Sequence, residues 1–362
     1  MSLDALRGFD MMFIMGLAAL LSNICALFPG GSDCWLATEM THVQWEGFRH
    51  HDTIFPLFLF LAGVSYPFSY SKQLERGFGR GRVYGKIFYR GLMLFFIGLL
   101  YNGLLKFDLP NLRWGGVLQH IGLAWMFAAL LFVNFRVVTR ACIAVVLLVG
   151  YWLLVKFVPA PDMPAGTDPY SMEGCIVGFV DRVCLPGRLY QGTFDPEGIL
   201  SLIPAVVTAM LGMFTGEFLR LPKEKVSGDR KTLCMLAAAA VMLGVGLLWS
   251  LDFPIIKKIW SSSFVLVAGA YSLACMAVFY WIIDVKGWRK WCFPLRIFGM
   301  NCITIYLVNR IFDLGYTVRF FLGGLAGLCN PAVGAVILSA GGLTLCWLVC
   351  LFLYRKNIFL KV

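Results

Sequence analysis

The sequence carries little charge: 14% of its 362 residues are Asp, Glu, Lys or Arg, whereas 59% are hydrophobic. Soluble domains have about a quarter charged residues. A soluble chain of this length cannot hide so much apolar surface in one core. The composition therefore excludes a cytosolic globular enzyme, a secreted disulfide scaffold and a disordered chain, and lipid is the expected surrounding of most of the protein.

Several short motifs are also missing. The chain has no CxxC pair and no His/Cys cluster with zinc spacing, so we expect no metal site. It has no Asn-x-Ser/Thr acceptor, which long loops facing a secretory lumen often carry, and this favours a bacterial inner membrane. Cys34, Cys175 and Cys184 lie between apolar runs, and their spacing does not select a disulfide partner.

Long apolar runs are plentiful instead. A membrane-spanning helix needs about 20 mostly apolar residues, and the chain contains about ten such runs. We predict an all-α, polytopic membrane helix bundle that forms one domain over residues 1–362. The predicted spans are 8–28, 52–71, 87–105, 115–134, 139–158, 198–219, 233–251, 261–283, 295–314 and 332–354.

The net charge of +11 would suggest nucleic-acid binding in a soluble protein. Here the basic residues form short clusters between apolar runs, which is the pattern of cytoplasmic loops. With the N-terminus inside, about two thirds of the 31 Lys and Arg residues fall on the inner side. We therefore predict that both termini are cytoplasmic and that no nucleic acid is bound, and we place the long loops 29–51 and 159–197 outside.

The polar residues near the outer face include all four histidines, His42, His50, His51 and His120. Imidazole can act as a base or a nucleophile, although a single interfacial histidine more often only binds water and backbone. Asp52 either caps the second span or orients His42. The segment Asp195-Pro196-Glu197-Gly198 is typical of a helix N-cap followed by proline at the first helical position.

A series of motifs resembles the heparan-alpha-glucosaminide N-acetyltransferase family nearly from end to end. His120 stands where the family has Arg, and Asn309-Arg310 where it has a His-Glu pair. The matching segments are Ser2-Leu3-Asp4-Ala5-Leu6-Arg7-Gly8, His42-Val43-Gln44-Trp45-Glu46-Gly47 with Asp52 and Phe55-Pro56, Gly116-Val117-Leu118-Gln119, Asp181-Arg182, Leu189-Tyr190-Gln191, Asp195-Pro196-Glu197-Gly198, Lys258-Ile259-Trp260-Ser261, Asp284-Val285-Lys286-Gly287 and Gly299-Met300-Asn301.

The resemblance implies that an acetyl group from cytoplasmic acetyl-CoA reaches the amine of a glucosamine or glucosaminide on the outer face. By this resemblance, His42 matches the family's catalytic histidine, and Asp52 and Gln119 are the further catalytic candidates. We expect the acetyl-CoA co-substrate to contact Arg7, Lys72, Arg76, Arg90 and Asn301. The residues expected on the acceptor sugar are Glu39, Trp45, Glu46, His120, Asp195, Glu197 and Trp260.

Two mechanisms fit this expectation. His42 either forms an acetyl-imidazole intermediate or takes the proton of the amine as a general base within a ternary complex. We favour the second, because it needs no reactive acyl-enzyme facing water. The competing interpretations are a transporter of amino sugars or cell-wall sugar fragments and a scaffold without catalysis. Besides the sugar acceptor, we expect membrane lipid as a partner. The sequence leaves open whether the protein forms a homodimer.

Overall fold

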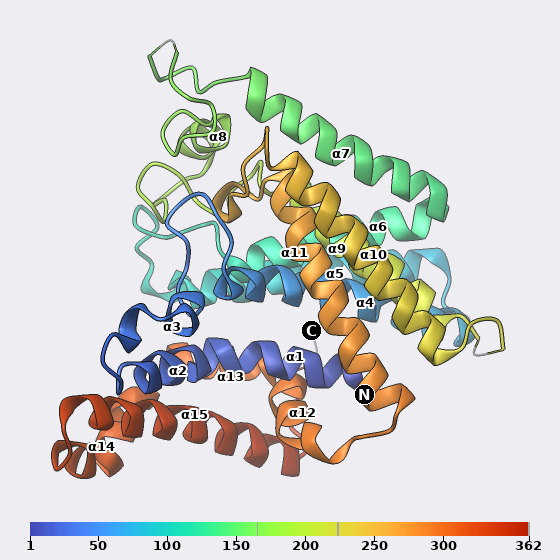
Figure 1. Cartoon of the computed structure of the whole chain (residues 1–362). Helices are drawn as coiled ribbons and strands as arrows, with labels where there is room; N and C mark the ends of the chain where they lie inside the picture. The colour runs from blue at the N-terminus through green and yellow to red at the C-terminus, as the bar shows by residue number, and fades with distance from the viewer. Residues whose placement is uncertain (165, 223, 361–362) are drawn as a thin grey trace. The chain divides into compact units, whose positions relative to one another are not determined.

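The computed structural model describes residues 1–164, 166–222 and 224–360, and their fold is helical apart from two isolated β-bridges (Figure 1). Lys223 and Lys361, which belong to the predicted inner basic residues, lie outside the described residues. Within them, 9 helices are long and apolar enough to cross a membrane, and the count is up to 10 if a bent pair forms one span. The predicted all-α membrane bundle is confirmed.

Each predicted span overlaps an observed one, but the bounds differ by several residues at many ends. The first span begins at Ser2 and the third at Arg80, because both take polar or charged residues into their first turns. The observed spans are Ser2–Cys25, His50–Glu75, Arg80–Tyr101, Val117–Asn134, Val137–Phe157, Leu202–Arg220, Gly228–Trp249, Ser262–Val285 and Pro331–Arg355, with the bent pair Lys290–Met300 and Cys302–Ile311.

The chain divides into two compact units. The first unit contains Met1–Gln44, Arg49–Ile54 and the described residues from Cys275 onward; the second contains Trp45–Phe48 and Phe55–Ala274. The prediction of a single membrane-embedded domain stays a prediction.

The first unit is built from interrupted helices. Its helices are α1 (Ser2–Met12), α2 (Ala18–Cys25), α3 (Trp35–Glu39), α12 (Phe293–Met300), α13 (Cys302–Ile311), α14 (Leu314–Gly327) and α15 (Pro331–Arg355). The π-helical turn η1 (Phe13–Leu17) joins α1 to α2 and contains Gly16 at φ 128°. Between α12 and α13 the axis bends by 59° at Asn301. The ninth predicted span is therefore a broken one, and α14 lies in the stretch that connects the ninth and tenth predicted spans.

The second unit packs continuous helices around α9. Its helices are α4 (Ile54–Glu75), α5 (Arg80–Tyr101), α6 (Val117–Asn134), α7 (Val137–Phe157), α8 (Ile176–Cys184), α9 (Leu202–Arg220), α10 (Gly228–Trp249) and the greater part of α11 (Ser262–Tyr280). α6, α7 and α10 each contact α9, and α5 packs along α6. Part of the long loop 159–197 folds into α8, whose Ile176 and Val177 pack with Tyr151 and Phe253 in a buried cluster.

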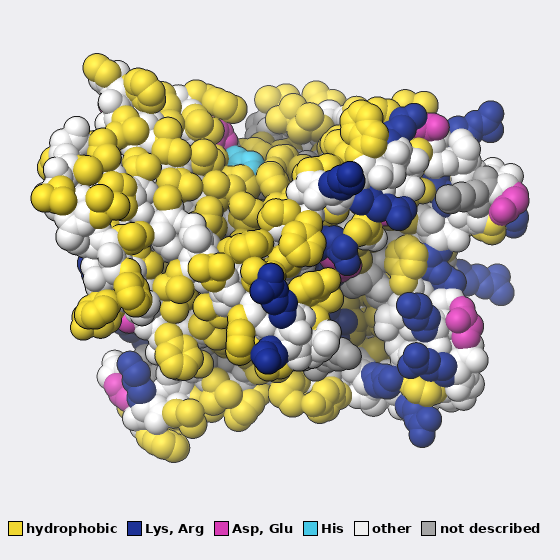
Figure 2. Space-filling model, turned by 90° about the horizontal axis from the view of Figure 1, so that it is seen from below, with side chains coloured by type: hydrophobic (Ala, Val, Ile, Leu, Met, Phe, Trp, Pro, Cys, Tyr) yellow, Lys and Arg dark blue, Asp and Glu magenta, His cyan; other side chains and the backbone are white. Residues whose placement is uncertain are grey.

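Apolar side chains point outward from the long helices. In α7, Val138, Val145 and Val146 are exposed, whereas the same helix buries Arg140. Figure 2 shows hydrophobic side chains over much of one face, with Lys and Arg in the middle and on the right of the view. Water would not tolerate so large a continuous apolar surface, so lipid is the solvent that these helices require.

Candidate functional site

The segment between α3 and α4 in the first unit holds a histidine–aspartate pair. Nδ1 of His42 lies 2.8 Å from Oδ1 of Asp52, and the second carboxylate oxygen accepts a hydrogen bond of 3.3 Å from the backbone N–H of Val43. The His42 side chain is 54% exposed and that of Asp52 is 2% exposed. A buried carboxylate thus fixes an exposed imidazole, an arrangement that places the lone pair of the neutral ring on Nε2.

The same loop brings the neighbouring histidines into the first unit. The rings of His42 and His51 have centroids 4.4 Å apart, and the ring of His50 lies 4.4 Å from that of Phe13. Glu39 accepts a hydrogen bond of 2.6 Å from the backbone N–H of His50. Glu39 therefore holds the start of the helical turn His50–Thr53 rather than the His42 ring.

Asp52 does not cap the second span, contrary to one of our two interpretations. The helical turn already begins at His50, and its N-cap position is Arg49. Because Asp52 follows that start, its carboxylate turns back toward the loop and meets His42 and Val43. The contact between Asp52 and His42 supports the interpretation that Asp52 orients His42.

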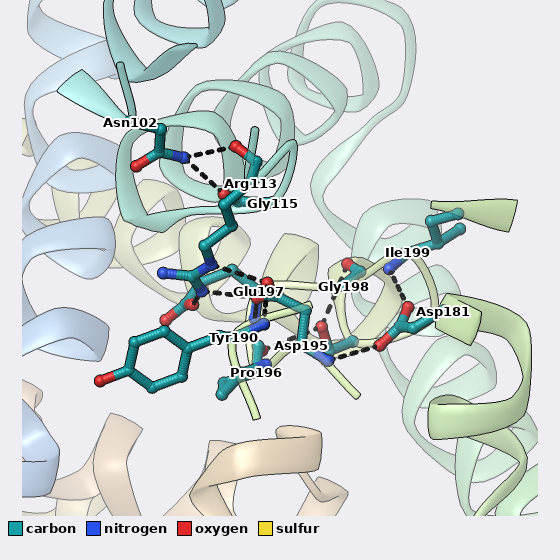
Figure 3. A network of polar contacts seen from close by, with 11 residues as sticks. Asn102, Arg113, Gly115, Asp181, Tyr190, Asp195, Pro196, Glu197, Gly198 and Ile199 are labelled. Atoms are coloured by element: carbon teal, nitrogen blue, oxygen red, sulfur yellow. Dashed lines mark hydrogen bonds and ion pairs between the residues drawn. The ribbon is translucent and has the colours of Figure 1, made fainter. Parts of the chain in front are cut away.

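The second unit contains a buried ion-pair cluster around Arg113 (Figure 3). The Arg113 guanidinium donates to both carboxylate oxygens of Asp195, at 2.7 and 2.5 Å, and also pairs with Glu197. Burial disfavours the charge of Arg113, but the two carboxylates outweigh that effect and raise its pKa. Two acids around one guanidinium leave the cluster with a formal charge of −1 (Arg113 +1, Asp195 and Glu197 −1 each) when all three are ionised.

Asp195 and Glu197 do not belong to the start of a helix, contrary to our prediction. The segment forms a turn closed by a 3.0 Å hydrogen bond from the Gly198 N–H to the Asp195 carbonyl, and α9 begins only at Leu202. Asp195 Oδ1 accepts from the Glu197 N–H at 3.1 Å while also binding Arg113. The turn thus presents its acids to Arg113 instead of to helix N–H groups.

Asp181, on α8, supports this turn from the other side (Figure 3). Its two oxygens accept hydrogen bonds from the backbone N–H groups of Ile199, at 3.0 Å, and Asp195, at 3.2 Å. Burial raises the pKa of Asp181 to about 7, although those hydrogen bonds act in the opposite direction. Asp181 can therefore exchange a proton near neutral pH.

His120 and Gln119 lie buried in the second unit near the start of α6. The His120 ring packs against those of Phe55 and Trp260, at centroid distances of 5.7 and 5.3 Å, and it hydrogen-bonds the backbone of Glu197. Nε2 of His120 and Nε2 of Gln119 have no hydrogen-bond partner among the described residues. These two buried atoms are available to a polar group of a ligand.

Within the second unit, Trp45 contacts residues of the segment 159–197. Its indole N–H donates to the Tyr170 carbonyl at 2.8 Å, and its ring contacts Phe194 edge-on at 5.6 Å. Glu46, beside it, is exposed. Trp260 is buried at φ 55° and donates from Nε1 to the Thr208 hydroxyl at 3.2 Å, so it serves the packing around His120.

The residues predicted to hold acetyl-CoA are spread over both units. In the first unit, Arg7 pairs with Asp4 at 3.4 Å. Asn301 is buried at the break between α12 and α13, and neither atom of its amide group has a hydrogen-bond partner among the described residues. Non-helical backbone at membrane depth usually lines a cavity or binding site, which is consistent with a ligand role for Asn301.

In the second unit, Lys72 and Arg76 are exposed at the end of α4. The guanidinium of Arg90 stacks 4.4 Å from the Trp125 ring centroid. Asp181 and Arg113 were absent from our predicted site. Arg113 has no acid at helical spacing, since its partners lie 82 and 84 residues further along the chain. The signals in the sequence for this cluster were the family motifs Asp181-Arg182 and Asp195-Pro196-Glu197-Gly198.

Comparison with known proteins gives a consistent result. The family model described as "Heparan-alpha-glucosaminide N-acetyltransferase, catalytic" matches residues 1–249. The heparan-alpha-glucosaminide N-acetyltransferase of Homo sapiens is 28% identical over 387 residues, covering 92% of this chain and 57% of that protein. The Mus musculus protein of the same name is 26% identical over 388 residues with the same coverage. The chain thus spans 57% of the length of these relatives.

Proposed function

Because the chain belongs to the heparan-alpha-glucosaminide N-acetyltransferase family, we propose that it is a membrane enzyme that transfers the acetyl group of acetyl-CoA to the amine of a glucosamine or glucosaminide. The observation that carries this proposal is the contact between His42 and the buried Asp52. A carboxylate that fixes the tautomer of an exposed imidazole is the usual arrangement of a general base.

In the direct mechanism, the amine nitrogen of the sugar attacks the thioester carbonyl. His42 Nε2 takes the proton that the amine loses, the C–S bond breaks, and the leaving CoA thiolate receives this proton from the His42 imidazolium. Asp52 keeps the Nδ1 proton in place and stabilises the imidazolium that forms. Gln119 is our candidate donor to the thioester oxygen, because its buried Nε2 has no partner among the described residues.

Acetyl-CoA needs cationic groups for its phosphates and polar groups for its pantetheine arm. We propose that Arg7, Lys72, Arg76 and Arg90 bind the phosphates and that Asn301 binds the pantetheine arm. The orphaned amide of Asn301 supports this assignment, since a buried amide is stabilised only when it is hydrogen-bonded.

The acceptor sugar, in this proposal, meets the outer loops and the acidic turn of the second unit. Asp195 and Glu197 supply negative charge for an ammonium group, and His120 supplies a hydrogen bond. Trp45, Trp260, Glu39 and Glu46 are the further acceptor-side candidates. Both termini would then be cytoplasmic, the loops 29–51 and 159–197 would face the periplasm of a bacterial inner membrane, and a homodimer is compatible with this arrangement.

The test reconstitutes the full chain in liposomes, with acetyl-CoA on one side and glucosamine on the other. We expect N-acetylglucosamine to form, and His42→Ala to abolish it while the variant keeps the thermal stability of the wild type. Absence of product from the wild-type protein, or an undiminished rate in His42→Ala, would contradict the proposal.

A second experiment separates the two mechanisms. The protein is incubated with radiolabelled acetyl-CoA and no sugar, and the label on the denatured chain is counted. Direct transfer predicts no label, whereas a label that His42→Ala removes would establish the acetyl-imidazole route. Sugar uptake into liposomes without CoA would instead identify a transporter.

A further inference from the structure

A pocket of about 410 Å³ lies in the second unit where several spans end on one side. α4, α6 and α9 finish there and α7 begins there, so the pocket is bounded by helix ends rather than by helix middles. It is lined by Tyr70, Ser71, Leu74, Phe132, Phe135, Arg136, Val137, Arg140, Glu217 and Arg220. None of these residues belongs to the proposed acetyl-transfer site.

The polar part of the lining is basic. The lining contains Arg136, Arg140 and Arg220 and one acid, Glu217, which gives a formal charge of +2 when all four are ionised (three positive, one negative). Arg140 is buried, and its Nη2 donates to both Glu217 oxygens at 2.8 Å. Its Nε has no hydrogen-bond partner among the described residues. Two arginines therefore carry charge that Glu217 does not neutralise, and a buried donor is unsatisfied.

The other part of the lining is apolar. Phe132 lies 4.5 Å from the Arg140 guanidinium, measured to the ring centroid. Leu74, Phe135 and Val137 also line the pocket and are exposed. A ligand that suits both parts has a phosphate beside a hydrocarbon chain.

We propose that this pocket binds the headgroup of an anionic phospholipid. The phosphate would lie against Arg136 and Arg220 and accept from Nε of Arg140, and the acyl chains would run along Phe135, Val137 and Leu74. Basic pockets at the ends of membrane helices are suited to such headgroups. The exposed apolar wall favours a lipid over coenzyme A, whose polar nucleotide would leave that wall uncovered.

The experiment measures thermal unfolding of the delipidated full chain in detergent while dioleoyl phosphatidylglycerol or phosphatidylcholine is added. We expect the first lipid to raise the midpoint and the second to leave it unchanged. The double variant Arg136→Gln/Arg220→Gln should need about tenfold more phosphatidylglycerol for the half-maximal shift, because two charge-assisted contacts to phosphate are lost.

Two further variants control this result. Arg136→Lys/Arg220→Lys keeps both charges and should retain most of the lipid response, and Arg80→Gln/Arg82→Gln removes two charges outside the pocket and should retain all of it. Equal lipid responses of wild type and Arg136→Gln/Arg220→Gln would overturn the proposal. So would a loss of coenzyme A binding, instead of lipid binding, in that variant, because the pocket would then hold the co-substrate.

Discussion

At the scale of single residues, the proposed base His42 is exposed, whereas the acid that contacts it, Asp52, is buried. Asp52 lies almost wholly out of water, and two hydrogen bonds hold its carboxylate in one direction. About half of the His42 side chain, by contrast, is exposed. A base needs access to its proton, whereas the group that orients it needs rigidity, so the two exposures differ for a physical reason.

We expect Asp52→Asn to lower kcat by about 10² to 10⁴, the range found when an orienting carboxylate or general base is disabled. An amide in place of the carboxylate no longer stabilises the imidazolium and permits the wrong tautomer. The measurement is acetyl transfer as a function of pH. Asp33→Asn, the same change at an exposed position of the same loop, should leave the rate unaltered; equal losses in both variants would refute an orienting role.

Asp181 gives a pH dependence with a definite sign. Its pKa rises from 3.8 to about 7 because it is buried. The folded state therefore holds this proton more tightly than the unfolded state does. The stability from this group is complete below the ordinary pKa and is lost as the pH rises through 7, with a slope of at most about 1.4 kcal/mol per pH unit.

Replacing Asp181 by Asn removes this titration and also one acceptor for a backbone N–H, the latter independently of pH. As the pH rises from 5 to 8, the midpoint of thermal unfolding of the wild type should therefore decrease relative to that of Asp181→Asn. Asp108→Asn, which changes an exposed carboxylate, should have the same midpoint as the wild type at every pH in this range. A midpoint difference that does not change with pH would show that Asp181 is ionised across this range.

At the scale of elements, the first unit depends on close approach between α1 and α12. A Cβ atom on Gly8 would lie 1.7 Å from the Leu295 carbonyl oxygen, and one on Gly299 would lie 1.9 Å from that of Asp4. Small residues that let backbones touch are the characteristic packing device of membrane helices. This contact lies directly before the break at Asn301, so it fixes where the broken span turns.

We expect Gly8→Ala or Gly299→Ala to destabilise the protein by at least about 1–3 kcal/mol, since the added methyl group forces two backbones apart. Thermal unfolding of the purified variants measures this. Gly342→Ala in α15 is the matched control, because a Cβ atom there would meet nothing within 4 Å. If Gly342→Ala lowers the midpoint of thermal unfolding as much as the two test variants do, close helix approach is not the cause of their destabilisation.

At the scale of the whole molecule, the distribution of charge predicts how the chain lies in the membrane. Cys184 is exposed in the loop 159–197, and Glu224 is exposed between α9 and α10. In intact cells, a membrane-impermeant maleimide should label Cys184 in a variant that retains only this cysteine. A cysteine at position 224 should react only after the membrane is opened. The reverse pattern would invert the predicted topology.

The sequence by itself determined the class of this protein, because apolar runs of membrane length are local features that no distant residue can override. It also picked out His42 and Asp52, which are only 10 residues apart. The first span, predicted at 8–28, begins six residues and ends three residues earlier in the structure, because helix ends depend on caps and fraying more than on hydropathy.

Only the tertiary structure decided what the polar groups contact. Arg113 finds Asp195 and Glu197 across more than 80 residues, and no periodicity in the chain connects them. The break at Asn301 and the basic pocket around Arg140 likewise arise from packing between helices. Hydrophobic burial is encoded locally and repeatedly, whereas a buried charge needs one particular partner, and that partner is fixed by the fold.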